Sequence, residues 1–398
     1  MDSSPPAAVA LPKTSVPDVS IIIPARNEEA NLGPCLESLT AQTGVAFEII
    51  VVDDASTDRT REIADSFHGV HVIAAGPLSQ GRAGQRSMTE QVTGKQLTGK
   101  PVTGKTNALK AGAARAHANW LLFTDADTVH LPGSLARALN EAAKEKADLL
   151  SYSPEQTVVT FTERAVMPVV FAELAAQYPP HKVRDRNSGI VAANGQYILV
   201  RRAAYKAVGG HAAVASEIIE DVALAKLFSN AGFRIYFRYA GDAVRTRMYR
   251  NWSQLREGWT KNLALLFPRP GRLLVMTLCR WSLAWFTICI AVSGALSHHF
   301  VWIAAAALWL LIYRRVRAAH FTAANNLIAM AFGLPMFAYL LLRSRNAYKR
   351  GQVSWKGRVY DVRSANGDAS ERSEIGDPIS RLANQIVSTE NRELRTGN

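Results

Sequence analysis

The chain has 398 residues, with 46 Lys and Arg against 33 Asp and Glu, and its formal net charge is +13. This length holds one catalytic domain of about 250 residues and an appendage. Three cysteines, at 35, 279 and 289, exclude a disulfide-rich scaffold and a zinc cluster, and agree with a reducing compartment.

At the start of the N-terminal half, predicted strands alternate with predicted helices. Residues 1–18 are rich in Pro, Ala and Ser, lack the pattern of a signal peptide, and are predicted to be disordered. A β-branched run at 19–24 and a second one at 47–52 are predicted strands, each followed by polar residues and a helix-like stretch. This order indicates a parallel sheet with right-handed crossovers.

The segment at 76–104 contains a misleading motif. Residues 99–106 satisfy the Walker A pattern and residues 121–125 resemble Walker B, so a P-loop NTPase is an alternative. However, three tandem Thr-Gly-Lys units at 92–105 produce the glycine spacing by themselves, and the preceding strand at 70–75 lies far from Gly99. We therefore expect a flexible, polar insertion before a helix at 107–117.

The apolar run Trp120 to Thr124 stops at two carboxylates, Asp125 and Asp127. Carboxylates at the end of a buried strand lie where open α/β sheets bind ligands, and two of them can chelate a divalent cation. The alternative is an acidic cap on the next helix. Because three successive strand ends carry polar clusters on one sheet edge, the sequence predicts a nucleotide site.

Glu220 and Asp221 form a second acidic centre, at the start of a helix predicted for Ser216 to Asn230. Acids there could simply stabilise the helix N-terminus, by roughly 0.3–1 kcal/mol. A further helix at Glu163 to Tyr178 is predicted either to lie on a membrane surface or to pack in the core, with the core favoured.

Three motifs resemble those of the family 2 glycosyltransferases: Ile-Ile-Pro-Ala-Arg-Asn-Glu at 22–28, Val-Val-Asp-Asp-Ala-Ser-Thr-Asp at 51–58, and Thr-Asp-Ala-Asp at 124–127. The likeness continues at 209–211, 219–225 and 247–249 and covers residues 19–265. It implies an α/β, GT-A-type nucleotide-diphospho-sugar transferase domain with a mostly parallel sheet. The later portion is most similar to the hopanoid- and carotenoid-associated members.

The resemblance also implies roles for individual residues. Asp53 and Asp54 would lie near the uracil of a UDP-sugar, Glu28 near the ribose, and Asp125 and Asp127 around the diphosphate and a divalent cation, Mg²⁺ or Mn²⁺. The full predicted donor-binding set is Pro24, Arg26, Glu28, Asp53, Asp54, Lys105, Asp125, Arg256 and Trp259.

Asp221 is the catalytic base that the resemblance implies, with Glu220 supporting it. Many family members carry Gln-x-x-Arg-Trp downstream, but residues 254–259 read Gln-Leu-Arg-Glu-Gly-Trp, with one inserted residue. Arg256 and Trp259 are the residues that could align with this motif. The alternative for Trp259 is anchoring at a membrane interface. Arg247, Arg256 and Lys261 are candidates for stabilising the leaving diphosphate.

The C-terminal part is apolar in three stretches, at 273–296, 301–313 and 326–342, each bordered by arginines. The first is long enough to cross a bilayer, the third is plausible and the second is short, with buried core helices as the alternative for the last two. We therefore predict a transmembrane region of two or three helices at 266–345, and a polar, partly disordered tail at 346–398.

The basic residues gather around these apolar stretches, which favours anionic lipid and excludes nucleic acid as the partner. With three spans, however, the basic groups cannot all face the cytoplasm. Either the short middle stretch is interfacial or one basic segment violates the positive-inside rule.

These observations predict a multi-pass hexosyltransferase of the plasma or inner membrane with a cytoplasmic catalytic domain. It would transfer a sugar, with inversion, from a nucleotide-diphosphate donor to the hydroxyl of a hopanoid- or carotenoid-like lipid. A polyprenyl-phosphate sugar synthase of the same fold is the main alternative. An inert membrane scaffold is the alternative from another class, and the three separated carboxylates Asp125, Asp127 and Asp221 argue against it.

Overall fold

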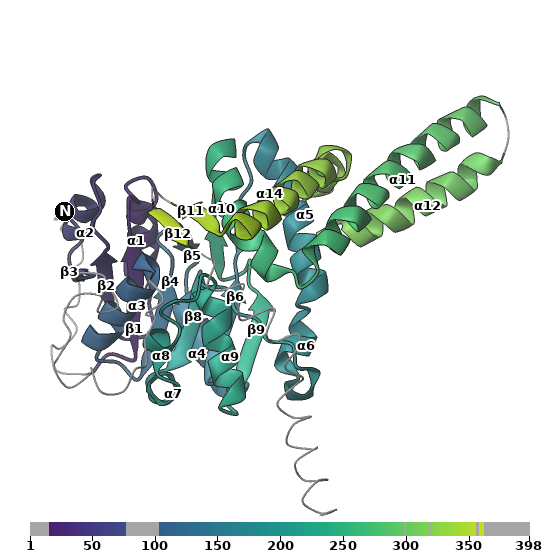
Figure 1. Cartoon of the computed structure of the whole chain (residues 1–398). Helices are drawn as coiled ribbons and strands as arrows, with labels where there is room; N and C mark the ends of the chain where they lie inside the picture. Colours follow the sequence, from purple (N-terminus) through teal and green to yellow (C-terminus); the bar gives the residue numbers. More distant parts are fainter. Residues whose placement is uncertain (1–15, 77–102, 298–299, 319, 356–357, 362–398) are drawn as a thin grey trace, which may run out of the picture.

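A seven-stranded sheet forms the centre of the protein. The computed structural model describes residues 16–76, 103–297, 300–318, 320–355 and 358–361. In spatial order, the strands are β3 (Val70–Ala74), β2 (Phe47–Asp53), β1 (Val19–Ala25), β4 (Trp120–Thr124), β8 (Tyr197–Arg201), β6 (Leu149–Ser153) and β9 (Ile235–Tyr239) (Figure 1).

Most neighbouring strands of this sheet are parallel. β1 pairs in parallel with β2 and β4, β2 with β3, and β6 with β9, whereas β8 runs antiparallel to both β4 and β6. The register sets Ala25 beside Asp53 and Ile22 beside Phe123, so β1, β2 and β4 end at one edge. The predicted α/β class with a mostly parallel sheet is confirmed.

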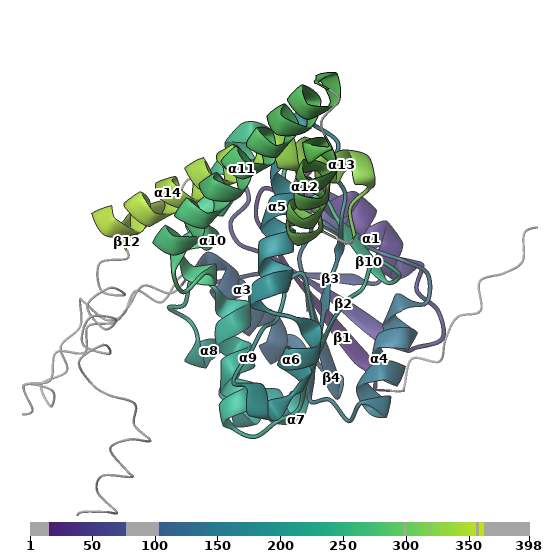
Figure 2. The same ribbon diagram turned by 90° about the vertical axis from the view of Figure 1, so that its right-hand side faces the viewer.

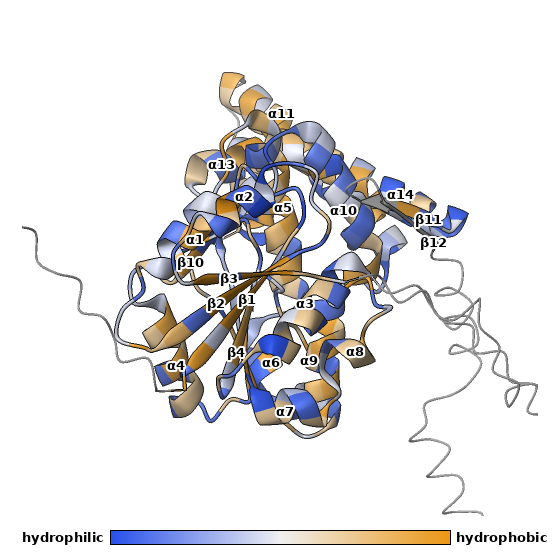
Figure 3. Cartoon of the chain, turned by 90° about the vertical axis from the view of Figure 1, so that its left-hand side faces the viewer, coloured by the Kyte–Doolittle hydropathy of each residue, from blue (hydrophilic) through white to orange (hydrophobic). Residues whose placement is uncertain are grey.

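Helices cover both faces of the sheet (Figure 2). On one face, α1 (Leu32–Thr40) and α4 (Ser134–Lys144) bury Leu36 and Leu135 against the strands. On the other face, α3 (Gly104–Arg115) and α9 (Glu220–Asn230) bury Leu109 and Phe228. Because both faces are covered, the strands are almost uniformly apolar, as the orange residues at the centre of Figure 3 show.

Two short sheets and several small helices accompany the central sheet. β5, β10 and β7 form a three-stranded sheet beside the end of β4, and β11 and β12 form a hairpin. These elements are α2 (Thr60–Asp65), β5 (Thr128–His130), β7 (Glu155–Gln156), α6 (Pro180–Arg184), a 3-10 turn (Arg186–Ser188), α7 (Arg202–Ala207), α8 (Gly210–Ala213), β10 (Val244–Thr246), β11 (Gln352–Trp355) and β12 (Arg358–Asp361).

The helix α5 (Phe161–Gln177) is a core helix, as favoured from the sequence. A capping box between Thr160 and Glu163 starts it, and Val166 and Val170 are fully buried against the C-terminal helices. The helix predicted for residues 216–230 starts only at Glu220, because the Ile219 backbone is not helical and Ile218 packs instead against Tyr348 and its neighbours.

The C-terminal part contains α10 (Trp252–Leu266), α11 (Pro270–Leu296), α12 (Val301–Val316), α13 (Ala323–Ile328), a π-helical turn η3 (Ala329–Gly333) and α14 (Leu334–Arg350). The helices α11 and α12 form a hairpin that projects from the rest of the molecule (Figure 1). Within the described ranges, two helices are long and apolar enough to cross a membrane, Pro270–Leu296 and the continuous Ala323–Arg350.

Some predicted segments lie partly outside the described residues. These are the disordered N-terminal segment, most of the loop with the Thr-Gly-Lys units, and most of the polar tail. The predicted boundaries at residues 18, 265 and 345 stay predictions. The described part of the tail begins inside α14, which continues to Arg350 and leads into β11.

Candidate active site

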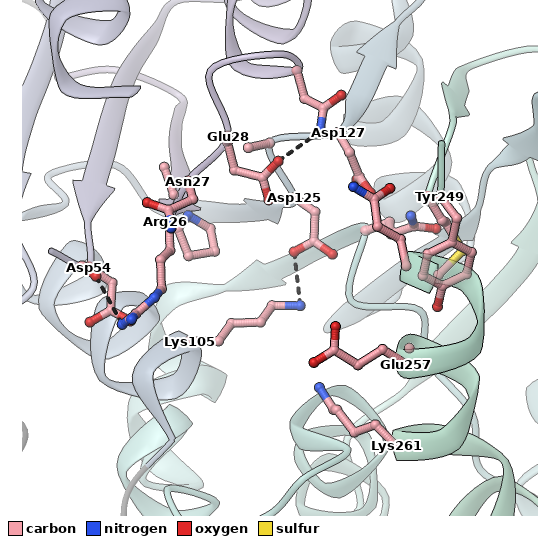
Figure 4. Close-up of a pocket in the computed structure, with 18 of the residues that line it drawn as sticks. Arg26, Asn27, Glu28, Asp54, Lys105, Asp125, Asp127, Tyr249, Glu257 and Lys261 are labelled. Atoms are coloured by element: carbon pink, nitrogen blue, oxygen red, sulfur yellow. Dashed lines mark hydrogen bonds and ion pairs between the residues drawn. The ribbon is translucent and has the colours of Figure 1, made fainter. Parts of the chain in front are cut away.

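A cavity of about 530 Å³ opens at the carboxyl edge of β1, β2 and β4. Figure 4 shows its walls, with side chains from these strand ends facing others from α10. Ten of the predicted site residues line it: Pro24, Arg26, Glu28, Asp54, Lys105, Asp125, Asp127, Glu220, Arg247 and Lys261.

The loops after β1 and β2 form one end of the cavity. The Arg26 guanidinium lies 3.6 Å from a carboxylate oxygen of Asp54. Burial raises the pKa of Asp54, and Arg26 opposes this rise. Asn27 and Ala55 both have positive φ, of 52° and 56°, a strained conformation for alanine that is typical of functional loops. The two loops therefore hold Asp54 in a fixed position at the cavity wall.

Asp53 and Glu28 are fixed by local hydrogen bonds. The Asp53 carboxylate accepts the backbone N–H of Ser56 at 3.1 Å, and Asp53 does not line the cavity. Glu28 lines the cavity and accepts a hydrogen bond from the Asn31 side chain at 2.8 Å. Of the two adjacent aspartates, therefore, Asp54 faces the cavity and Asp53 shapes the turn.

Lys105 lies at the centre of the site, near the start of α3. Thr103 caps this helix by accepting the backbone N–H of Thr106 at 3.2 Å. The Lys105 Nζ lies 2.9 Å from Asp125 Oδ1 and 2.9 Å from Glu220 Oε1. Burial acts to lower the pKa of Lys105, but these two carboxylates outweigh it and hold this pKa well above its usual value. The ammonium group of Lys105 thus links the end of β4 to the start of α9.

The backbone around Asp125 and Asp127 is held by hydroxyl groups. Thr128 donates to the Asp125 carbonyl at 2.7 Å, and Thr246 of β10 donates to the Asp127 carbonyl at 3.1 Å. Burial raises the pKa of Asp125, and Lys105 opposes the rise.

A divalent cation fits this pair of carboxylates. Within the described ranges, no group of three or more His, Cys, Asp and Glu side chains could hold a metal ion. Asp125 and Asp127 nevertheless both line the cavity. Two carboxylates suit Mg²⁺ or Mn²⁺ when phosphate and water supply the remaining oxygen ligands.

Glu220 and Asp221 differ in environment although they are adjacent. Burial acts to raise the pKa of Glu220, but Lys105 and Lys261 outweigh it and lower this pKa. Burial raises the pKa of Asp221 to about 6, and the neighbouring Glu220 adds to the rise. Glu220 therefore stays ionised to a lower pH than Asp221, whose pKa is about 6.

The backbone positions the Asp221 carboxylate, which does not itself line the cavity. Its two oxygens accept the N–H groups of Gly195 and Val222, each at 2.8 Å. A Cβ atom at Gly195 would lie 3.2 Å from Lys105 Nζ and 3.3 Å from Asp221 Oδ2. A glycine at 195 therefore lets Lys105 and Asp221 approach the same point of the backbone.

The helix α10 forms the opposite wall through one of its faces. This face consists of Gln254, Glu257, Gly258, Lys261 and Asn262. Lys261 is one of the residues predicted from the sequence. The spacing of three and four residues is that of one helix face, so periodicity would have found the other four once the orientation of the helix was known. Burial lowers the pKa of Lys261.

Arg256 and Trp259 are not brought to the cavity. Trp259 is only 2% exposed and packs against Tyr249, with ring centroids 5.9 Å apart. The hydroxyl of Tyr249 in turn lies where a Cβ of Gly258 would be, 2.4 Å away, so this contact requires glycine. The membrane-interface alternative for Trp259 does not apply either, because the side chain lies in the core.

Arg250 and Val353 are among the cavity residues that had no signal in the sequence motifs. Arg250 donates to the Asn31 side chain at 2.7 Å and thereby ties the segment before α10 to the loop after β1. Val353 of β11 reaches the cavity from the C-terminal segment, which the sequence indicated only as a polar tail.

Known proteins that are similar to this chain are glycosyltransferases. The model of glycosyl transferase family 2 matches residues 20–209. The chain is 26% identical over 361 residues to the 4,4'-diaponeurosporenoate glycosyltransferase of Staphylococcus aureus strain USA300, covering 86% of this chain and 88% of the relative. The relative from strain MRSA252 is 26% identical over 363 residues, with the same coverage.

Solved structures are more distant. A mannosyltransferase from Pyrobaculum calidifontis in complex with GDP-Man and Mn²⁺ has a TM-score of 0.43 and 16% identity, covering 86% of this chain and 90% of that one. Glucosyl-3-phosphoglycerate synthase from Mycobacterium tuberculosis in complex with Mn²⁺, UDP and glucosyl-3-phosphoglycerate has a TM-score of 0.38 and 18% identity, covering 64% and 85%.

Residues 20–209 thus form a family 2 glycosyltransferase domain, and the chain is a glycosyltransferase. The resemblance inferred from the motifs is confirmed, and so is the GT-A-type α/β fold class, whose strand order and strand-end cavity the structure displays.

Proposed function

We propose that this family 2 glycosyltransferase moves a hexose from a nucleotide-diphosphate donor to a carotenoid-like lipid at a membrane. The observation that carries this proposal is the convergence of Lys105 on Asp125 and Glu220, 2.9 Å from each, in the strand-end cavity. This cluster gathers groups for a diphosphate, and Asp221, next to Glu220, supplies the carboxylate for an acceptor.

The nucleoside would lie against the loops after β1 and β2. Asp54 and Glu28 offer carboxylate acceptors for base and ribose, and Arg26 orients Asp54 from 3.6 Å. The positive-φ backbone at Asn27 and Ala55 would keep this surface preformed. UDP is the nucleotide that the family resemblance implies.

The diphosphate would lie between the end of β4 and α10. Asp125 and Asp127 would hold a divalent cation, which when bound neutralises charge developing on the leaving diphosphate. Lys105 and Lys261 add positive charge at the same place, because both side chains line the cavity. Release of Lys105 from Asp125 would free this carboxylate for the cation.

Transfer would invert the anomeric centre. The acceptor oxygen forms a bond to C1 of the sugar as the bond between C1 and the diphosphate oxygen breaks, and Asp221 takes the proton from the acceptor hydroxyl. A pKa near 6 suits this role, because the group is ionised at neutral pH yet remains basic. Glu220 holds Lys105 in place and raises the basicity of Asp221.

An acceptor that is already ionised is the second candidate. The Staphylococcus aureus relatives are named for diaponeurosporenoate, whose suffix denotes a carboxylate. A carboxylate, or the phosphate of a polyprenyl phosphate, would attack C1 without losing a proton and would yield a glycosyl ester or phosphodiester. The effect of Asp221 substitution distinguishes these acceptors from a hydroxyl.

The apolar C-terminal helices, and the carotenoid for which the relatives are named, support membrane attachment. The catalytic domain would face the cytoplasm, where nucleotide sugars are made, at the plasma membrane or the bacterial inner membrane. The acceptor would reach the cavity from the side of α10 and β11, since Lys261 and Val353 line that wall.

The test is product formation. Membranes containing the chain are incubated with radiolabelled UDP- or GDP-hexoses and either a carotenoid alcohol or a carotenoid acid, and the lipid extract is analysed by mass spectrometry. The proposal predicts label in a glycosylated lipid with the wild type and none with the Asp125→Asn/Asp127→Asn double variant. Donor hydrolysis without a labelled lipid, or equal products from both proteins, would contradict it.

A further inference from the structure

The hairpin of α11 and α12 exposes large apolar side chains to its surroundings. Phe286 and Val292 of α11 are 60% and 54% exposed, and Leu311 and Ile303 of α12 are 63% and 50% exposed. Only 17% of the most apolar 18-residue window of α11 is buried. Figure 1 shows the hairpin extending away from the sheet and its helices. Such a surface requires an apolar partner.

A charged cluster marks the level at which the hairpin leaves the domain. Glu173 of α5 is 5% exposed and accepts hydrogen bonds from Arg280 of α11 at 2.6 Å and from Arg315 of α12 at 3.5 Å. Next to it, the Trp281 indole N–H donates to the Ala331 carbonyl at 2.9 Å. Both arms are thus held to α5 and η3 by charged and polar contacts at their base.

The whole of α11 is long enough to cross a bilayer, but the part of each arm that lies beyond this cluster is not. The apolar stretch from Trp281 to Leu296 has 16 residues and a length of about 24 Å, and the stretch from Val301 to Tyr313 has 13 residues and a length of about 20 Å. The hydrocarbon core of a bilayer is about 30 Å thick and needs about 20 residues. Stretches of this length are typical of segments that enter a membrane without crossing it.

The third apolar segment lies along the domain. Half of its most apolar 18-residue window is buried, and α14 packs against α10, α5 and α11. At Gly333 the helix approaches α5 so closely that a Cβ would lie 1.8 Å from the Ala165 carbonyl. Its outer face exposes Phe332 and Leu342, at 51% and 41%. This pattern fits a helix in the plane of a membrane surface.

We propose that the hairpin enters a lipid bilayer from one face and turns back within it, while α13 to α14 lie along that same face. The catalytic domain, both ends of the hairpin and β11 are then on one side of the membrane. Arg272, Arg314 and Lys349 accordingly lie on this side and face anionic headgroups. This one-sided arrangement removes the conflict with the positive-inside rule that three spans create.

The side of the membrane on which each segment lies is tested with one added cysteine, in a background that keeps only the buried Cys35. In a Cys279→Ser/Cys289→Ser background, Val16→Cys reports the catalytic side and Lys349→Cys reports the end of α14, and both positions are exposed. A membrane-impermeant maleimide labels both variants in inverted membrane vesicles and neither in intact cells, if the proposal is correct. Labelling of the two cysteines from opposite sides would overturn it, because α13 to α14 would then cross the membrane.

The depth to which the hairpin enters the bilayer is tested with a label at its tip. A spin label at Ser297→Cys, reconstituted in vesicles of phosphatidylcholine and phosphatidylglycerol, is expected to be relaxed by oxygen and not by a water-soluble nickel chelate on either side. Relaxation by chelate on the side opposite the catalytic domain would show that the hairpin spans the bilayer. Relaxation by chelate on the side of the catalytic domain would show that the hairpin is not inserted. Protection from both agents would show a protein cover, such as a second copy. Each of these three results overturns the proposal.

Discussion

The two walls of the cavity are built in different ways. On one wall, Arg26, Asp54 and Asp125 follow the ends of three adjacent strands, so the register of the sheet fixes where they lie. On the other wall, Glu257 and Lys261 belong to α10, and their direction depends on how that helix is rotated. Site residues at strand ends can therefore be predicted from the sequence. For a helix, the sequence predicts only that one of several faces lines the site.

The rotation of α10 is set by its packing. Leu255, Trp259 and Leu263 are almost fully buried in one cluster with α5 and α14, which leaves the face of Glu257 and Lys261 toward the cavity. Substitutions on the two walls should therefore differ in kind. Changes at the strand ends should lower activity alone, and changes on the packed face of α10 should lower stability first.

The largest effect is expected at the strand ends. Asp127→Asn should lower the transfer rate by about a thousandfold, because the substitution removes a ligand of the cation that neutralises the leaving diphosphate. Steady-state kinetics with saturating metal would measure this loss. The control is Asp65→Asn, whose side chain is exposed on α2, and it should be as active as the wild type. Wild-type activity of Asp127→Asn, or of the wild type in excess chelator, would remove the metal assignment.

On the helical wall, Trp259→Ala should lower the free energy of unfolding by about 3 kcal/mol, because it opens a cavity in the core. Arg256→Ala, one turn earlier, should leave both stability and kcat/KM nearly unchanged. Thermal denaturation in detergent and donor kinetics test the pair. A stable Trp259→Ala protein with poor donor binding would instead place Trp259 in the donor site.

Lys105 joins the two acidic centres, so its loss should affect both. Lys105→Met should reduce transfer by roughly a hundredfold, since a cation that stabilises the diphosphate is removed. It should also move the acidic limb of the pH profile upward, because Lys105 holds down the pKa of Asp221. Lys110→Met on the exposed side of α3 is the matched control. An unshifted profile would show that Lys105 does not act on Asp221.

The smallest expected effect is that of pH on the wild type. If Asp221 is the base, transfer to a hydroxyl should rise about tenfold between about pH 5 and pH 7, with a midpoint near 6. Because this pKa lies above its unfolded value of 3.8, the folded state binds the proton more tightly, and the stability that this proton contributes is lost as the pH rises from the unfolded value to about 6. A rate independent of pH from 5 to 7 would point to an acceptor that is already ionised.

The sequence predicted most of the strand-end wall, because continuous apolar runs that stop at polar residues are local signals. The family resemblance then named the side chains that follow these runs. It also predicted α5 as a core helix from its apolar residues. It could not choose between Asp53 and Asp54, since the positive-φ turn at Ala55 decides which carboxylate faces the cavity. The sequence could not predict that Val353 lines the cavity, because only tertiary packing brings β11 to the site.

The direct test of the central claim compares Asp221→Asn with the wild type on a hydroxyl acceptor. A hydroxyl is a poor nucleophile until its proton is removed, so turnover should fall by roughly a hundredfold or more. Donor affinity should be nearly unchanged, and circular dichroism should confirm folding. Near-normal transfer to the hydroxyl lipid by Asp221→Asn would contradict the assignment of Asp221 as the base.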